Sequence, residues 1–528
     1  MTIPNEFMEK IHFITLATLM VSPVFAQKTP EKFAETILAN DLKKHLSVIA
    51  HDSLEGRGTG TPGQWKAAKY IANHFKTIGL KPVGKGNSYL QPVELVKGSW
   101  KEVYAIVGGT RRELYKDFYV AGTKSIPQEQ PIEVVFAGYG IETEAYNDFK
   151  NIDVNGKLVV VLDGEPKTES GTFVLTGTDK GSEWTERGGA QKKQKLLTDK
   201  GAIGSISIAK QADEDQEKAF ARMKGFSARL SQLVFKDDAN RGKSPLQITA
   251  KQSLVKEVLG LTDQQFADLI AAKMAAGAAK GRLIMKAERL EEDVETSNVV
   301  GFLEGTDKKE EVIIVTAHYD HIGIGNDGQI NNGANDDGSG TVTVMEVAEA
   351  FAAAKAKGQG PRRSILFMTV TGEERGLLGS EYYVEHPIFP LENTVVDLNI
   401  DMVGRTDKDH EGKGDYIYVI GSDKLSSELH TINEAANQQH TQLDLDYRFN
   451  DPKDPNRFYY RSDHYNFAKK KIPVAFYFNG VHADYHRPTD DIEKIEFDKA
   501  EKVGRLVFYT AWELANRDKR IVVDSNKQ

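Results

Sequence analysis

Val312-Ile313-Ile314-Val315-Thr316-Ala317-His318-Tyr319-Asp320 is the stretch from which the fold can be worked out. Ile313–Ala317 is a short apolar run rich in β-branched residues, which is typical of a buried strand. Two similar runs follow at 365–370 and 395–400, and helical patterns at 341–354 and 375–386 separate the three. Strands that alternate with helices predict an α/β fold with a mixed, mostly parallel sheet flanked by helices.

Imidazole and carboxylate groups follow each of these strands. His318 comes directly after the first run, the glutamates at 373–374 follow the second, and Asp401 closes the third. In an open α/β sheet, ligands bind at the carboxyl ends of strands, so these groups meet in one crevice. Asp336, in the loop before a predicted helix, and the late His486 add to the set. Each group alone has an ordinary structural explanation; together they indicate a site.

Composition limits what that site can bind. The chain has 528 residues, which is enough for two or three domains, and 40% of them are hydrophobic. It has no cysteine, so any transition-metal site must use histidine and carboxylate ligands. The formal net charge of −9 argues against nucleic acid and against anionic membrane surfaces as partners.

The N-terminal segment resembles a targeting sequence. Lys10 precedes an apolar run at 11–21, and Pro23-Val24-Phe25-Ala26 follows it. This pattern predicts a signal peptide at 1–26, cleaved after Ala26, and export to the periplasm or the medium. No other segment approaches ~18 consecutive apolar residues, so we expect no stable membrane insertion and a soluble mature protein.

Changes in sequence pattern divide the rest of the chain. Residues 31–85 have helical periodicity around a glycine-rich turn at 54–61, which we interpret as a connector. From 115 to 290 the pattern is of short strands and glycine turns, with a polar, irregular stretch at 210–243 that predicts a long loop. We therefore expect one catalytic domain built from 27–114 and 291–528, and a β-rich domain inserted at 115–290.

Five segments together resemble peptidase family M28, in the order and with spacing similar to those of that family. They are Ala317–His321 (AHYDH), Gly333–Gly340 (GANDDGSG), Gly372–Gly376 (GEERG), Asn399–Gly404 (NIDMVG) and Tyr485–Pro488 (YHRP). The resemblance covers about 31–115 and 297–515 and implies the zinc-exopeptidase fold. The inserted region more weakly resembles a protease-associated (PA) domain, through Phe136–Gly140, Gly156–Val159 and Lys200–Ala202.

Carried over residue by residue, the resemblance implies two Zn²⁺ ions per chain. One zinc would bind His318 and Asp401, the other would bind Glu374 and His486, and Asp336 would bridge both. The family also implies a cis peptide bond between Asp336 and the residue after it. Three carboxylates and a hydroxide offset the four positive charges of two zinc ions, so this ligand set is electrostatically reasonable.

Further residues receive predicted roles around the ligands. Glu373 would be the general base, and Asp320, two residues after a ligand histidine, would orient that imidazole. Tyr485 would donate its hydroxyl to the tetrahedral oxyanion, for which the alternative is a packed aromatic ring. Arg461 would fix the terminal groups of the substrate, with a structural ion pair as its alternative. Three further histidines are assigned structural roles: His321, His464 and His482.

The resemblance implies an aminopeptidase that acts on peptides. One alternative is a glutaminyl-peptide cyclase of the same fold, which uses a single zinc ion. A carboxypeptidase or dipeptidase is another, and its relatives carry a helical dimerisation domain after the catalytic part. A third is a binding protein that has lost the ligands. The sequence leaves the side-chain preference, the role of the inserted region and the oligomeric state open.

Overall fold

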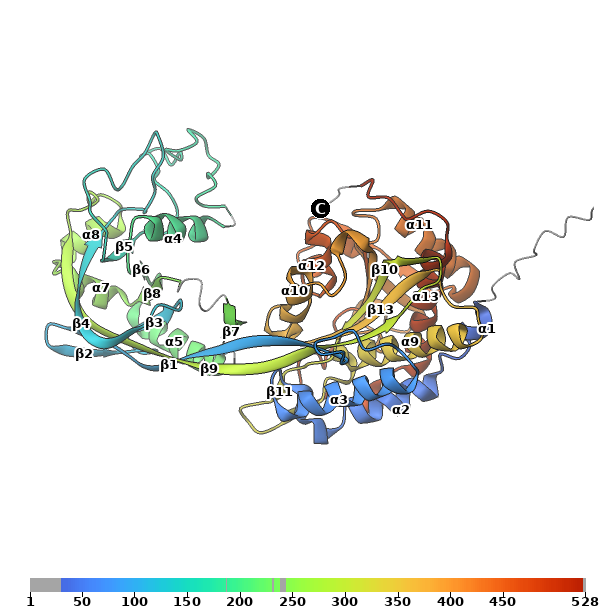
Figure 1. Cartoon of the computed structure of the whole chain (residues 1–528). Helices are drawn as coiled ribbons and strands as arrows, with labels where there is room; N and C mark the ends of the chain where they lie inside the picture. The colour runs from blue at the N-terminus through green and yellow to red at the C-terminus, as the bar shows by residue number, and fades with distance from the viewer. Residues whose placement is uncertain (1–29, 187, 230–231, 238–243, 526–528) are drawn as a thin grey trace, which may run out of the picture.

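The computed structural model of the chain describes residues 30–525, apart from 187, 230–231 and 238–243. The predicted signal peptide at 1–26 therefore lies outside the described residues. Two β-containing parts are visible in Figure 1, an α/β part with helices around its sheet and a second lobe. Two long antiparallel strands, β1 (Leu90–Val107) and β9 (Lys280–Leu303), run from one to the other.

The α/β part contains the predicted mixed, mostly parallel sheet. The strand order is β16-β15-β17-β14-β10-β13-β9, and only the β13–β9 and β15–β17 pairs are antiparallel. The bounds are β10 (Lys308–His318), β13 (Arg363–Val370), β14 (Thr394–Ile400), β15 (Tyr416–Ile420), β16 (Asp444–Asp446) and β17 (Val474–Phe478). The fold prediction is confirmed, and the three predicted strands are β10, β13 and β14.

The central strands are buried because helices cover both faces of the sheet. Successive side chains of a strand point to opposite faces, so Ile313 and Val315 join one apolar core while Val312 and Ile314 join the other. The first core is shared with α1 (Glu31–Ala34), α2 (Ala39–Ile49), α3 (Pro62–Thr77), α9 (Gly340–Ala356), α11 (Ser427–Ala436) and α13 (Phe497–Asn516). The second core includes α10 (Leu378–Glu385) and α12 (His464–Lys469).

The second lobe has its own sheet and apolar core. From β9 the strand order continues β4-β5-β6-β8-β3. Its elements are β2 (Thr110–Glu113), β3 (Phe118–Ala121), β4 (Ile126–Phe136), β5 (Leu158–Val161), α4 (Gly189–Asp199), β6 (Gly204–Ile208), β8 (Leu246–Ala250), α7 (Gln252–Val258) and α8 (Asp263–Ile270). Strand β9 continues through residue 290, so the predicted domain limits do not coincide with an interruption of this strand.

The prediction of a long irregular loop at 210–243 is wrong. Helix α5 (Asp213–Arg229) and strand β7 (Gln232–Phe235) lie within it, and β7 pairs with β1. The first turn of α5 is acidic, which favours a helix start, and Phe220 on the same helix is fully buried. A charged helix with a narrow apolar side has the composition of a loop, and this misled the prediction.

No helix within residues 30–525, gaps excepted, is long and apolar enough to cross a membrane.

Candidate metal centre

The carboxyl ends of three parallel strands bring the predicted ligands together. His318 is the last residue of β10, and it pairs with Val370 at the end of the neighbouring β13. Glu374 lies in the short helical turn η3 (Glu373–Arg375) after β13, and Asp401 directly follows β14. Because these strands are parallel, their ends meet at one edge of the sheet, as the sequence predicted.

Two loops add the remaining ligands. Asp336 lies in the π-helical turn η2 (Ala334–Ser339), which leads directly into α9. The Asp336–Asp337 peptide bond is cis, as the resemblance implied. His486 lies in the loop after β17, with its side chain 39% exposed, whereas the side chains of His318 and Asp336 are almost fully buried.

The five predicted ligands form two groups that share Asp336. Nε2 of His318 lies 3.3 Å from Oδ1 of Asp336 and 3.6 Å from Oδ1 of Asp401. Nε2 of His486 lies 3.2 Å from Oδ2 of Asp336 and 3.2 Å from Oε2 of Glu374. Asp336 therefore has one oxygen toward each histidine, which is the arrangement expected of a carboxylate that bridges two ions.

Proton sharing within the centre shows how strongly these carboxylates attract positive charge. Burial opposes ionisation of Asp336, yet hydrogen bonds from His318 and His486 hold its pKa well below the ordinary value. Burial lowers the pKa of His486, but its hydrogen bonds to Asp336 and Glu374 raise it to about 10. The imidazoles thus hold protons where the chemistry of the site favours cations.

Two buried carboxylate oxygens supply the test of whether metal fits. Oδ2 of Asp336 lies 3.2 Å from Nε2 of His486, and Oε1 of Glu374 lies 2.8 Å from Nδ1 of His321, in geometry too poor for a well-formed hydrogen bond. A buried carboxylate oxygen without a well-formed hydrogen bond is costly, and coordination of a cation removes that cost. Imidazole nitrogen and carboxylate oxygen are zinc ligands, so the donor set fits zinc.

Glu373 lies beside the first group. Its Oε2 is 3.9 Å from Nε2 of His318, and ligand atoms of Glu373, His318 and Asp401 all lie within 4.8 Å of one another. Burial raises the pKa of Glu373 well above its usual value; His318 opposes this, and the carboxylates of Glu374 and Asp401 add to it. The structure thus places a carboxyl with raised proton affinity next to the metal-ligand residues.

His321 is a neighbour of the centre that the sequence interpretation did not place there. Its fully buried ring has Nδ1 2.8 Å from Oε1 of Glu374 and 3.8 Å from Oδ2 of Asp336. In the sequence, His321 directly follows Asp320 just beyond the end of β10, and this position could have indicated that it lies near the other groups at the strand ends. The other two histidines given structural roles make different contacts: His464 stacks on a phenylalanine ring, and His482 bonds the side chain of Asn335, the residue before Asp336.

Asp320 contacts His318 differently from the prediction. Nδ1 of His318 lies 3.0 Å from the main-chain oxygen of Asp320, whereas the carboxylate Oδ1 is 3.9 Å away. That carboxylate accepts hydrogen bonds from the hydroxyl of Thr59 at 2.8 Å and from the main-chain N–H of Glu373 at 3.1 Å. The imidazole is therefore oriented by a carbonyl group, and the Asp320 side chain positions the η3 turn instead.

Asp337 and Arg57 hold the surrounding backbone, and neither was singled out from the sequence. The carboxylate of Asp337 accepts main-chain N–H bonds from His318, Gly340 and Met402, at 3.1, 2.9 and 3.0 Å. The fully buried guanidinium of Arg57 donates to four main-chain carbonyl groups, two of them in the segment just before η2. Main-chain bonds of this kind fix the segments that carry the ligands.

A hollow opens beside the predicted metal ligands. Apart from Asp336, Glu373 and Asp401, its lining is largely apolar: Met402, Phe458, Phe476, Phe478, Val481 and Tyr485, with Arg461. The ring of Tyr485 stacks on that of His486 with centroids 3.8 Å apart, and its Oη is 3.4 Å from Nη2 of the exposed Arg461. Tyr485 and Arg461, for which the sequence predicted contacts with the oxyanion and with the substrate termini, therefore both line this hollow.

The part of the chain that carries this site is similar to known peptidases. Residues 298–511 match the model of Peptidase family M28. Aminopeptidase YwaD of Bacillus subtilis is 28% identical over 235 residues, which cover 43% of this chain and 46% of that protein. A probable leucine aminopeptidase of Arthroderma otae is 31% identical over 235 residues, or 44% of this chain and 61% of that protein. The chain thus spans about half to three fifths of the length of these relatives.

A solved structure resembles nearly the whole chain. The aminopeptidase from Aneurinibacillus sp. strain AM-1 superimposes with a TM-score of 0.54 at 18% identity, and the match covers 95% of this chain and 100% of that one. At 18% identity this likeness concerns the fold alone. Because the match covers 95% of this chain, the shared fold includes the second lobe.

Proposed function

We propose that the chain is a zinc-dependent aminopeptidase of peptidase family M28 that removes N-terminal residues from peptides, because residues 298–511 match the model of that family. The observation that carries the proposal is the pair of histidine–carboxylate groups joined by Asp336, beside a hollow that has acidic groups at one part of its lining and aromatic rings at another. Two similar proteins named as aminopeptidases support it.

We propose two zinc ions per chain. His318 and Asp401 would hold one, Glu374 and His486 the other, and Asp336 both. Bound zinc supplies Lewis acidity, which polarises a peptide carbonyl and lowers the pKa of a water molecule. His321 and Glu373 are the nearest further groups, and we assign neither of them as a ligand.

The protein's own residues would then move the protons. Glu373 would accept a proton from the attacking water and return it to the leaving amine, a role for which its raised pKa is suited. Burial, followed by the carboxylates of Asp336 and Glu374, raises the pKa of Tyr485, so its hydroxyl stays protonated and can donate to the oxyanion.

The hollow fits one end of the substrate. The carboxylates of Glu373 and Asp401 would receive the positively charged N-terminus, and the aromatic wall formed by Phe458, Phe476 and Phe478 would bury an apolar first side chain. Arg461 at the hollow would pair with substrate carbonyl oxygens, since its cation would repel the amino terminus.

A substrate panel tests the proposal. Leucine and phenylalanine p-nitroanilides should be cleaved at least ten-fold faster than the lysine compound, and N-acetylated forms should be inert, with the zinc count measured on the same preparation. Cleavage of blocked peptides but not of free ones would refute the assignment. One zinc per chain together with cyclisation of N-terminal glutamine would favour the cyclase, and release of C-terminal residues would favour a carboxypeptidase.

Two further parts of the proposal concern export of the protein and its division into domains. We propose that residues 1–26 are removed on export to the periplasm or the medium, and that 115–290 form a PA-like insert within a catalytic domain of 27–114 and 291–528. N-terminal sequencing of the protein recovered from its native compartment tests the first. Limited proteolysis tests the second: cuts near 115 and 290 that release a stable fragment would support the division.

A further inference from the structure

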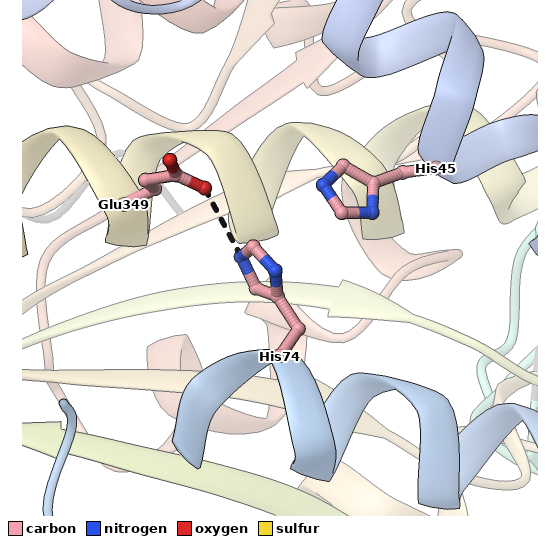
Figure 2. A group of neighbouring side chains, drawn as sticks. All are labelled: His45, His74 and Glu349. Carbon is pink, nitrogen blue, oxygen red and sulfur yellow. Dashed lines mark ion pairs between the residues drawn. The ribbon is translucent and has the colours of Figure 1, made fainter. Parts of the chain in front are cut away.

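A second group of histidine and carboxylate side chains lies between helices on one face of the sheet. His45 comes from α2, His74 from α3 and Glu349 from α9, and Figure 2 shows the three side chains turned toward a common space. Glu346, one turn earlier on α9, also reaches His45. Glu349 lies roughly 14 Å along the axis of α9 from its first residue, so this group is separate from the strand-end centre.

The spacing of these atoms is close to that of metal ligands. Nε2 of His45 is 3.4 Å from Oε1 of Glu346, and Nε2 of His74 is 3.7 Å from Oε2 of Glu349. Ligand atoms of His45, His74 and Glu349 all lie within 4.8 Å of one another. Around a tetrahedral zinc with bonds of about 2.1 Å, ligand atoms are roughly 3.4 Å apart. A bound ion would therefore draw the three side chains together and would replace the contact of 3.4 Å between Nε2 of His74 and the main-chain oxygen of Met345.

The orientation of His45 also suits a ligand. Its Nδ1 lies 2.8 Å from the hydroxyl oxygen of Tyr70, which leaves Nε2 facing the carboxylates. A ligand histidine typically donates its second ring N–H to an oxygen, which fixes both tautomer and ring direction. Tyr70 supplies such an oxygen from α3, and in Figure 2 the other nitrogen of His45 points toward the remaining two side chains.

Burial and charge make a bound cation favourable. The side chains of His45, His74 and Glu346 are only 12%, 10% and 4% exposed. Asp41 and Lys44 are the other charged groups that act on them, so three acidic side chains, those of Glu346, Glu349 and Asp41, face one ammonium group.

We propose that His45, His74 and Glu349 bind a divalent transition-metal ion of the zinc type, apart from the peptidase centre, with Glu346 beside His45. Imidazole nitrogens exclude calcium and magnesium as preferred ions, and two histidines with a carboxylate are a known zinc ligand set. The ion would fasten α2 and α3 to α9, the helix whose N-terminal end follows the turn that carries Asp336.

Metal counting on the full chain tests this site. Untagged protein is stripped with chelator, reloaded with Zn²⁺ and freed of excess, and zinc per chain is then measured by mass spectrometry. Glu349→Gln and His74→Gln should each hold one zinc fewer than wild type. The matched control Glu513→Gln, at an exposed position on α13, should hold the wild-type number. Glu349 is half-exposed, so its substitution should leave the fold intact.

Two further readings separate this site from the proposed peptidase. Glu349→Gln should keep the wild-type rate on any substrate that the protein cleaves, because it lies outside the catalytic machinery. Tyr70→Phe should weaken the affinity of this site about 10–100-fold in competition with a chromophoric chelator. Equal zinc content and equal affinity in wild type and both ligand variants would overturn the proposal, whether or not the protein is a peptidase, and would leave a proton-sharing histidine–glutamate cluster.

Discussion

Replacing Glu373 with glutamine separates general-base catalysis from metal binding. The substitution keeps the size of the side chain and removes its ability to take a proton. General acid–base catalysis contributes typically ~10²–10⁴-fold, so kcat should fall by that factor, or about 2.7–5.4 kcal/mol of barrier. Glu373 is also 3.9 Å from Nε2 of His318, close enough that the alternative role of a ligand must be tested.

The neighbouring Glu374→Gln variant is the matched control. Both residues lie in the η3 turn, but Glu374 contacts His486 at 3.2 Å, and its Oε1 lies 2.8 Å from Nδ1 of His321. We expect Glu373→Gln to retain zinc and to lose kcat with little change in KM. The Glu374→Gln variant should lose zinc, and excess zinc should partly restore its activity. The assay pairs steady-state kinetics on leucine p-nitroanilide with zinc counting on the same samples.

Two results would refute this reasoning. A turnover of Glu373→Gln within a few-fold of wild type would remove Glu373 from proton transfer. A loss of zinc from Glu373→Gln equal to that from Glu374→Gln would make it a ligand, and the measured fall in rate would then reflect an incomplete metal centre.

Three other perturbations test separate parts of the structure. In the metal-free protein the pKa of His486 is raised to about 10, so the stabilising contribution of its proton is complete below pH 6.5 and is lost as the pH rises toward 10. Zinc must displace this proton at neutral pH, so zinc affinity should increase by about ten-fold per pH unit for each proton released. Competition with a chelator from pH 6.5 to 9 measures this, and an affinity that does not increase would contradict the reasoning. Tyr485→Phe should lower kcat about 10²-fold or more with zinc content unchanged, as judged by the same kinetics, and an unchanged kcat would leave it a packed aromatic ring. Arg57→Ala should cost at least about 3 kcal/mol in urea unfolding, because four buried main-chain carbonyl groups lose their donor; a change below about 1 kcal/mol would show that water replaces the guanidinium.

The parts predicted well from the sequence were those set by local pattern. Apolar runs such as Ile313–Ala317 are strands because they are buried on both faces, and that requirement is visible in the residues themselves. The predicted ligands converge because parallel strands end at one edge, which follows from alternation of strands and helices. The resemblance to a family added Asp336 as the shared residue, and the geometry around it agrees.

The parts that escaped prediction depend on contacts between distant segments. Arg57 lies in a glycine-rich turn that looks like a plain connector, and only the folded chain brings four carbonyl oxygens to its guanidinium. His321 next to an aspartate has the pattern of a surface pair, but the end of β10 directs it into the core beside Glu374. Helix α5 was missed because charge on a solvent-facing helix resembles the composition of a loop.

The contacts of Asp337 indicate how the fold could position the proposed metal ligands without metal. Its carboxylate accepts N–H bonds from the end of β10, the start of α9 and the residue after Asp401, so one side chain joins three ligand-bearing segments. Burial raises the pKa of this carboxyl well above its usual value, and the nearby Asp401 adds to the effect. The main-chain N–H donors favour the ionised form and so offset part of the free-energy cost of burying the carboxylate. Because these bonds involve no ligand atom, the backbone positions of His318 and Asp401 are set by the fold, and metal affinity then depends on side chains that need little rearrangement.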